Sequence, residues 1–373
     1  MDRIYLDNAA TTQLAPEVME AMLPYLANHF GNPSSIYSYG RETRLAIENA
    51  RKLVAKNLGV KPGEIFFTSG GTESNNTAIA AAIRDLECKH IISSPIEHHA
   101  VLHTVEHYAS EKFVTTSFVS ILPTGEVDYE DLELQLKESK EKTFVSLMHA
   151  NNETGVLLDL ERAGNLCKKY NAVFHSDCVQ TIGHYPLDLT KVFIHFISGA
   201  SHKFHGPKGS GILYVSDKIN IKPYIFGGGQ ERNMRAGTEN VYGIVGFAKA
   251  LEMAMLNYEK DRAYIQDLKQ YMKERLEKEI DQVSFNCYDN SLYTILSVCF
   301  PKTKKAEFLL MNLDINNICA SGGSACSSGA SIGSHVMQAL NKNENCATVR
   351  FSLSKYNTKE EIDKVVDKLK ELI

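Results

Sequence analysis

Short apolar runs alternate with longer amphipathic stretches along most of this chain of 373 residues. Residues 89–93 are followed by 100–108, and residues 144–148 are followed by 160–170. A short apolar run is typical of a buried strand, whereas apolar residues spaced three and four apart indicate a helix. This alternation predicts an α/β fold with a mostly parallel central sheet covered by helices. Ligands of such folds bind at the carboxyl ends of the strands.

The pattern changes beyond Gly243. We expect one long helix over residues 245–279, then strands over 293–298 and 347–352 and a helix over 359–372. Strands and helices that are not strictly alternating predict a smaller α+β unit. A chain of this length also exceeds one ordinary hydrophobic core, so two domains are expected.

Cys326 lies in the run from Ser321 to Ser331, where all the other residues are Gly, Ser or Ala. Nothing bulky is present to bury the thiol, and an exposed thiolate is a nucleophile. Cys326 is therefore a candidate for chemistry. An incidental cysteine in a flexible surface loop fits this run alone equally well.

Lys203 stands between two apolar runs, 192–197 and 212–215, and Asp177 ends a third, 172–176. An acid and a lysine at strand ends suit pyridoxal phosphate, because the carboxylate keeps the pyridine nitrogen protonated while the amine holds the aldehyde as an imine. Taken singly, Lys203 fits an ordinary loop and Asp177 fits a helix cap.

Residues 66–76 read as a strand, a glycine turn, a hydroxyl and a helix start, and an Ala-rich helical stretch follows. This order aims backbone N–H groups and a helix dipole at a phosphate. Gly70 and Gly71 lack the third glycine of a dinucleotide site, and no Gly-Lys-Thr or Gly-Lys-Ser follows at P-loop spacing. A small phosphorylated cofactor is therefore the expected ligand.

Composition narrows the class of protein. The 40 basic and 45 acidic residues give a net charge of −5, which shows no global bias toward nucleic acid or anionic membrane. No apolar run has membrane-spanning length and the first residues do not resemble a secretion signal, so we expect a cytoplasmic protein without a membrane partner. The eight cysteines contain no Cys-x-x-Cys pair, so neither a zinc site nor a disulfide framework is expected.

Motifs spread over nearly the whole chain resemble those of cysteine desulfurases of the class V aminotransferase family, the enzymes of iron–sulfur cluster assembly and nitrogen fixation. Each motif alone is weak, but together they are specific. They lie at residues 5–12, 31–35, 68–75, 97–98, 149–155, 175–177, 201–203, 235–240 and 349–352 and in the Cys326 loop.

The resemblance implies a fold-type I pyridoxal phosphate transferase that forms a homodimer. The large cofactor-binding domain would span 13–250, and residues 1–12 and 251–373 would form a small domain with the Cys326 loop. The cofactor contacts implied are Gly71, Thr72, His98, Asn152, Asp177, Gln180, Ser201, His202, Lys203 and Thr238.

The same resemblance assigns individual roles. His98 would stack on the cofactor ring and take part in catalysis, although a histidine pair is also common at a helix start. Asn152 and Gln180 would hydrogen-bond toward the phenolic oxygen of the ring, and Asn152 would also contact substrate, although Asn151-Asn152 also fits a simple turn. Thr72 and His202, with Thr238 from a second subunit, would hold the phosphate.

Alternation along 348–352 puts Arg350 on the strand face opposite Val349 and Phe351. Such a cation often points to solvent. The resemblance instead assigns the substrate carboxylate to Arg350, which suits the planar fork of a guanidinium.

The implied reaction converts L-cysteine to L-alanine. Lys203 would move the Cα proton, and Cys326 would receive the sulfur as a persulfide and pass it to an acceptor or cluster scaffold protein. No metal site is expected, although Cys326 would be able to ligate an iron–sulfur cluster during transfer.

Three positions depart from the family pattern, namely Tyr37, Cys178 and Ala200, and phosphate contacts are then expected from Ser201 or the backbone. Two alternatives stay open from the sequence. One is a selenocysteine lyase or small-molecule aminotransferase on the same fold, and the other is a non-catalytic scaffold paralogue.

Overall fold

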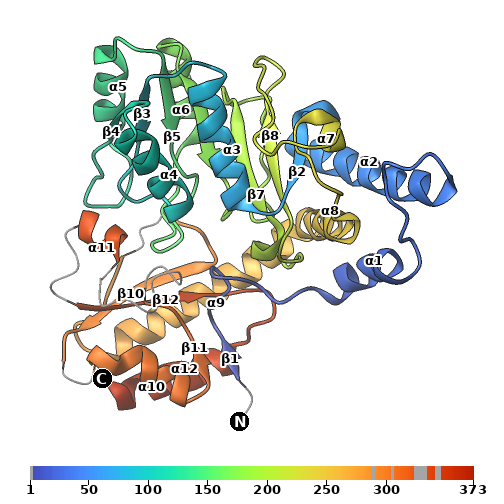
Figure 1. The fold of residues 1–373 in the computed structure, drawn as a ribbon. Coiled ribbons are helices and arrows are strands. Elements are labelled where there is room, and N and C mark those ends of the chain that lie inside the picture. The colour runs from blue at the N-terminus through green and yellow to red at the C-terminus, as the bar shows by residue number, and fades with distance from the viewer. Residues whose placement is uncertain (1–2, 287–289, 304–305, 323–333, 341–345) are drawn as a thin grey trace.

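A computed structural model describes residues 3–286, 290–303, 306–322, 334–340 and 346–373 (Figure 1). These residues form two units, each with its own sheet and apolar core. The larger unit lies at the top of Figure 1, and the smaller unit, which contains both ends of the described chain, lies below it.

A sheet of seven strands forms the centre of the large unit. Its order is β2-β8-β7-β6-β5-β3-β4, with β8 antiparallel to both neighbours and all other pairs parallel. The predicted mostly parallel sheet is therefore confirmed. The strands are β2 Ile65–Thr68, β3 His90–Ser93, β4 Thr115–Phe118, β5 Thr143–Ser146, β6 Val173–Asp177, β7 Phe196–Ala200 and β8 Gly211–Val215.

Helices cover both faces of this sheet because successive strand residues point to opposite sides. Phe144 packs in the cluster with α3 and α4, whereas its neighbour Val145 packs in the cluster with α1, α2, α6 and α8. The helices are α1 Pro16–Ala27, α2 Ser38–Leu58, α3 Gly71–Arg84, α4 His99–Ser110, α5 Tyr129–Glu138, α6 Leu160–Lys169, α7 Gln230–Asn233 and α8 Val241–Leu256.

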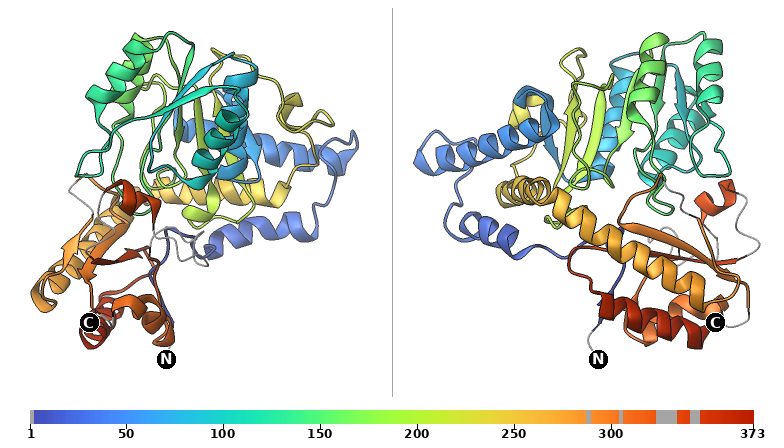
Figure 2. Two further views of the ribbon diagram at one scale, coloured as in Figure 1. Left: turned by 60° about the vertical axis from the view of Figure 1, so that its left-hand side comes forward. Right: turned by 180° about the vertical axis from the view of Figure 1, so that it is seen from behind.

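The small unit combines an antiparallel sheet of order β12-β10-β9 with helices, and β1 pairs in parallel with β11 beside it. Ile4 and Leu6 from the start of the chain share its core with Leu296 and Phe351. Figure 2 shows the first residues beside the last helix. The elements are β1 Ile4–Tyr5, α9 Tyr258–Glu279, β9 Ser284–Phe285, β10 Ile295–Pro301, α10 Leu309–Ile315, β11 Ile318–Cys319, α11 His335–Ala339, β12 Cys346–Ser352 and α12 Lys359–Leu372.

The single helix expected over 245–279 is wrong, because α8 and α9 are separate helices that meet at Asn257. The Asn257 side chain donates to the carbonyl oxygen of Met253 at 2.9 Å, a local bond that competes with helix continuation. Ala250 and Leu251 still pack in the core of the large unit. We therefore propose that the units divide at Asn257 and not at residue 250.

A disulfide joins Cys299 in β10 to Cys346 in β12, so the expectation of no disulfide is wrong for this pair. The two cysteines are 47 residues apart, and antiparallel register brings them together by placing Cys346 opposite Pro301. No short-range motif in the sequence encodes such a pairing. Among the described residues, no helix has both the length and the apolar character needed to cross a membrane.

A buried ion pair holds a strained turn against the large unit. Glu231, Arg232 and Asn233 have φ values of 43°, 57° and 66°, which non-glycine residues rarely adopt. Both carboxylate oxygens of Glu231 accept from Arg51 at 2.8 Å, and one also accepts from the backbone N–H of Phe67 at 2.8 Å. These bonds fix the turn to α2 and β2.

We expect Glu231→Gln to lower the free energy of unfolding by about 3 kcal/mol, because Arg51 loses its buried counterion and keeps only the half-exposed Glu48. Urea denaturation followed by circular dichroism measures the change. Lys61→Ala, which removes an exposed ion pair with Asp217, is the control and should leave the unfolding curve unchanged. Equal curves for the two variants would contradict a stabilising role for the Arg51–Glu231 pair.

Candidate active site

A solvent-open cavity of about 250 Å³ lies where the strand ends of the large unit meet the N-terminal segment and β12. It brings together most of the site residues predicted from the sequence. These are Gly71, Thr72, His98, Asn152, Asp177, Gln180, His202, Lys203 and Arg350.

Lys203 ends the short helical turn Ser201–Lys203 that follows β7. Its Nζ donates to the carbonyl oxygens of Ala9 at 2.5 Å and Ala10 at 2.8 Å. Gln180, expected at the cofactor ring, also donates to the Ala9 carbonyl, at 3.0 Å. The N-terminal segment therefore positions the amine at one wall of the cavity.

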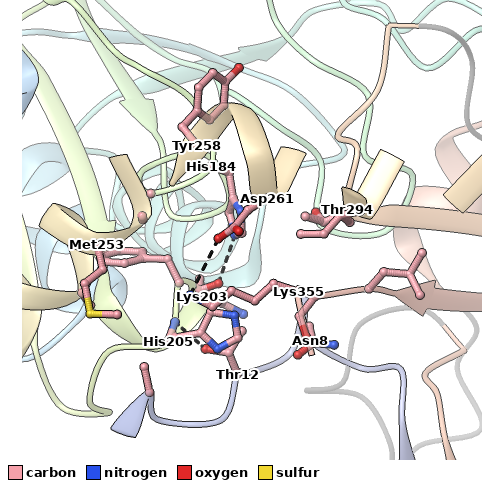
Figure 3. A pocket seen from close by; sticks show the side chains of 18 of the residues that line it. Asn8, Thr12, His184, Lys203, His205, Met253, Tyr258, Asp261, Thr294 and Lys355 are labelled. Atoms are coloured by element: carbon pink, nitrogen blue, oxygen red, sulfur yellow. Dashed lines mark hydrogen bonds and ion pairs between the residues drawn. The ribbon is translucent and has the colours of Figure 1, made fainter. Parts of the chain in front are cut away.

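A second, narrow cavity of about 40 Å³ is also lined by Lys203 (Figure 3). In it, His184 Nε2 is 3.0 Å from the Lys203 carbonyl oxygen and His184 Nδ1 is 3.3 Å from the Tyr293 hydroxyl. Burial lowers the pKa of His184 to about 4, so the ring is neutral and donates through Nε2 to Lys203. The turn that carries the amine is thus tied to Tyr293, a core residue of the small unit.

Asp177 ends β6 and is held by two donors. Asn75 Nδ2 donates to Oδ2 at 2.6 Å, and the backbone N–H of Val179 donates to Oδ1 at 3.0 Å. Hydrogen bonds of this kind favour the charged form of a carboxylate. Sequence reasoning gave Asn75 no role, although a polar residue on the apolar Ala78 and Ala82 face of α3 was an available signal.

His98 caps the start of α4, where its Nδ1 accepts from the backbone N–H of Ala100 at 3.1 Å. Burial lowers the pKa of His98, and the nearby Lys203 lowers it further, while Asp177 opposes both effects. The ring is therefore neutral near pH 7 and carries its proton on Nε2, which makes it a hydrogen-bond donor.

The start of α3 forms the phosphate-sized end of the cavity. Gly70 has φ 154° and ψ −179°, a conformation open essentially to glycine alone, and it aims the first backbone N–H groups of α3 at the cavity. His202 lines the same cavity, and burial together with Lys203 and Lys208 lowers its pKa to about 4. A neutral His202 acts there as a donor and adds no charge.

The prediction for Ser201 is wrong, because its hydroxyl is directed at the carbonyl oxygens of Pro207 at 2.5 Å and Ser210 at 3.0 Å. Ser201 is fully buried and stabilises the Gly-Pro turn after Lys203. Of the other departures, Ala200 lines the cavity, whereas Cys178 packs in the apolar core and Tyr37 is exposed.

Two further predictions are not tested within one chain. Thr238 lies in a different cavity, beside Ser69 and Arg235, so its contact from a second subunit stays a prediction. Cys326 lies outside the described residues, which end at Gly322 on one side and resume at Ser334 on the other. Burial raises the pKa of Cys88 to about 11 and that of Cys178 to about 12, so these two thiols are poor nucleophiles near pH 7.

Arg350 reaches the cavity from β12, while Val349 and Phe351 point into the core of the small unit as their alternation predicts. Its Nη2 donates to Asp7 Oδ1 and its Nη1 donates to the carbonyl oxygen of Asn152, both at 2.7 Å. Asp7 is a partner that sequence reasoning did not assign.

These residues fit pyridoxal phosphate. A carboxylate fixed by two donors suits a pyridinium nitrogen, an amine at the cavity wall suits an aldehyde, and a helix start with a Gly-only turn suits a phosphate. The buried oxygen Oδ1 of Asn75 also has no hydrogen-bond partner among the described residues. A bound ligand would be able to supply the donor that this oxygen lacks.

Comparison with known proteins agrees with this chemistry. The family described as aminotransferase class-V, whose members depend on pyridoxal phosphate, matches residues 4–365. A protein named cysteine desulfurase IscS from Dictyoglomus turgidum is 43% identical, over 99% of this chain and 94% of its own length.

Solved structures are similar as well. A NifS-like protein superposes with a TM-score of 0.91 at 38% identity, covering 99% of both chains. A structure described as SspA in complex with cysteine gives a TM-score of 0.82 at 32% identity, covering 95% of this chain and all of its own.

We expect Asn75→Ala to weaken pyridoxal phosphate binding about tenfold, because one hydrogen bond to the Asp177 carboxylate contributes about 1.5 kcal/mol. Titration of the apoprotein with the cofactor, followed by absorbance, measures the affinity. Asn57→Ala is the control, since the Asn57 amide makes only a bond within α2, to the Leu53 carbonyl. Unchanged cofactor affinity in Asn75→Ala would remove Asn75 from the site.

Proposed function

The chain belongs to the aminotransferase class-V family, and on this premise we propose that it is a cysteine desulfurase. It would convert L-cysteine to L-alanine and transfer the sulfur to Cys326 as a persulfide. One observation carries the proposal: a single cavity brings Lys203 and Asp177, which suit the cofactor, together with Arg350, which suits a substrate carboxylate. The similarity to the desulfurase of Dictyoglomus turgidum, over almost the entire chain, supports the choice of substrate.

Pyridoxal phosphate supplies the electron sink for the charge that develops at the substrate Cα. Lys203 would hold the cofactor and then move the Cα proton, since Ala9 and Ala10 already fix its Nζ at the cavity wall. Asp177 would pair with the pyridine nitrogen, since Asn75 and the Val179 N–H hold its carboxylate in place. Neutral His98 would donate a hydrogen bond through Nε2.

The sulfur transfer balances without an external oxidant. The Cys326 thiolate attacks the substrate sulfur, the new S–S bond forms, and the Cβ–S bond breaks with its electron pair left on carbon. Protonation of that carbon gives alanine, and the enzyme keeps one extra sulfur atom. The cysteine-bound SspA structure supports the fit of this amino acid to the family fold.

We further propose a homodimer in which Thr238 contacts the partner's cofactor. Apolar side chains of α1 and of the segment up to α2 support this, since Leu26, Phe30 and Ile36 are 53%, 75% and 88% exposed. A sulfur acceptor or cluster scaffold protein would receive the persulfide sulfur, for iron–sulfur clusters and other thiolated products. The cytoplasmic location stays a prediction.

We expect Cys326→Ser to bind L-cysteine and to release no alanine, because the nucleophile is lost while the cofactor site is intact. Absorbance of the cofactor measures binding, and amino-acid analysis measures alanine. Mass analysis of the wild-type protein after cysteine treatment should find one added sulfur on the peptide with Cys326.

Cys178→Ser is the matched control, since that thiol is buried in the core, and it should release alanine at the wild-type rate. Normal alanine release from Cys326→Ser would instead favour a lyase or aminotransferase. No cofactor absorbance in the wild-type protein would favour a non-catalytic scaffold.

We expect Arg350→Lys to raise the KM for L-cysteine about tenfold or more, because an ammonium cannot bind a carboxylate through two parallel N–H groups. The lysine keeps a positive charge beside Asp7, so the fold should be retained, as thermal denaturation would verify. A KM equal to that of the wild-type protein would mean that Arg350 does not bind substrate.

A further inference from the structure

Arg350 lines the cavity and is already paired with Asp7, a carboxylate of the same chain. Its side chain is 2% exposed, and Nη2 donates to Asp7 Oδ1 at 2.7 Å. Its Nη1 is also committed, to the Asn152 carbonyl oxygen. The remaining nitrogen, Nε, is buried and has no hydrogen-bond partner among the described residues. The guanidinium is thus held in place with part of its donor capacity unused.

Asp7 is itself fixed from two sides. Its second oxygen, Oδ2, accepts from the Ser321 hydroxyl at 2.8 Å. Backbone bridges place Asp7 beside Ser352 and Ser321 beside Arg350. Asp7 therefore lies between two donors that belong to adjacent backbone segments, and it can keep one when it loses the other.

The geometry of a guanidinium makes Nη2 common to both ways in which it binds a carboxylate. A carboxylate that binds through two N–H groups uses either Nη1 with Nη2 or Nε with Nη2. Both arrangements include Nη2, which carries two N–H groups, and Asp7 accepts from one of them. An amino-acid carboxylate therefore meets the Asp7 carboxylate at a single nitrogen of Arg350.

Two carboxylates beside one buried cation repel each other strongly, because little water screens them. Of the Asp7–Arg350 pair, Asp7 is the residue whose side chain can move away. Its side chain is 16% exposed, against 2% for Arg350, and Ser321 offers a second donor for its charge. Movement of Asp7 away from Nη2 would relieve the repulsion, while Ser321 would still donate to Asp7 Oδ2.

We propose that Asp7 is a positioning residue that sets the affinity for the substrate carboxylate. It holds Arg350 in the binding orientation in the free enzyme and yields Nη2 when the carboxylate of an amino acid arrives. It returns to Nη2 when the product leaves, which opposes product retention. The inference rests on the proposed function only in that Arg350 binds an amino-acid carboxylate.

The test is a titration of the cofactor-loaded protein with L-alanine and with ethylamine, which differ by the carboxylate group, followed by cofactor absorbance. Asp7→Asn keeps the size of the side chain and one acceptor oxygen for Arg350 but removes the competing charge. We expect this variant to bind L-alanine about tenfold more tightly, which is less than the full like-charge repulsion because Asp7 can move toward Ser321 in the wild-type protein. Ethylamine affinity should not change.

Two matched variants control for structural effects. Asp7→Glu retains the negative charge and should not tighten L-alanine binding. Ser321→Ala retains Asp7 and should not tighten it either. With L-cysteine as substrate, Asp7→Asn should lower KM about tenfold without raising kcat.

Weaker or unchanged L-alanine binding by a folded Asp7→Asn variant would overturn the proposal, because Asp7 would then only stabilise Arg350. An equal gain for ethylamine would overturn it as well, since the carboxylate would not be the group concerned. The proposed function is tested separately: if it is wrong, the wild-type protein forms no alanine from L-cysteine. The L-alanine titration still tests the role of Asp7 in that case.

Discussion

The hydrogen bonds made by residues 7–10 are the constraint on which the active site depends. The amine of Lys203 belongs to the large unit and the guanidinium of Arg350 to the small one, yet both must face one small ligand. Ala9 and Ala10 accept from Lys203, and Asp7 accepts from Arg350. Residues 7–10 form a tight turn that is closed by a hydrogen bond from the Ala10 N–H to the Asp7 carbonyl oxygen at 3.0 Å. One short turn therefore contacts both groups and holds them at the same cavity.

Charge in the cavity is kept low and local. Burial keeps the rings of His98 and His202 neutral by lowering their pKa values, and Lys203 adds to the effect. The rings therefore donate hydrogen bonds without competing with Lys203 and Arg350 for anions. The Asp177 carboxylate at the cavity accepts from Asn75, and the Asp7 carboxylate paired with Arg350 accepts from Ser321. The site can thus distinguish the pyridinium, phosphate and carboxylate ends of its ligands by position.

Local patterns in the sequence predicted the elements well, because periodicity and strand ends are local properties. Helix α12 and the strand-end positions of Asp177 and Lys203 are examples. Long-range partners were missed. The Cys299–Cys346 disulfide depends on β10–β12 register, and the Asp7–Arg350 pair depends on an isolated bridge between distant segments. The Ser201 prediction failed because Ser201 was expected to replace the phosphate contact missing at Ala200, whereas its turn offers the hydroxyl the carbonyl oxygens of Pro207 and Ser210.

Two buried guanidinium groups show how a structural cation differs from a binding one. Every nitrogen of Arg51 is paired, since Glu231 takes Nη1 and Nη2 and Glu48 takes Nε. Arg350 has the same 2% exposure but only single bonds from Nη1 and Nη2, and its Nε has no partner among the described residues. Leaving a buried donor unsatisfied costs free energy, so a native structure retains one where a ligand later supplies the acceptor. The incomplete pairing of Arg350 is therefore the physical mark of a carboxylate site, and Asp7 is the residue that keeps this cost small while the site is free.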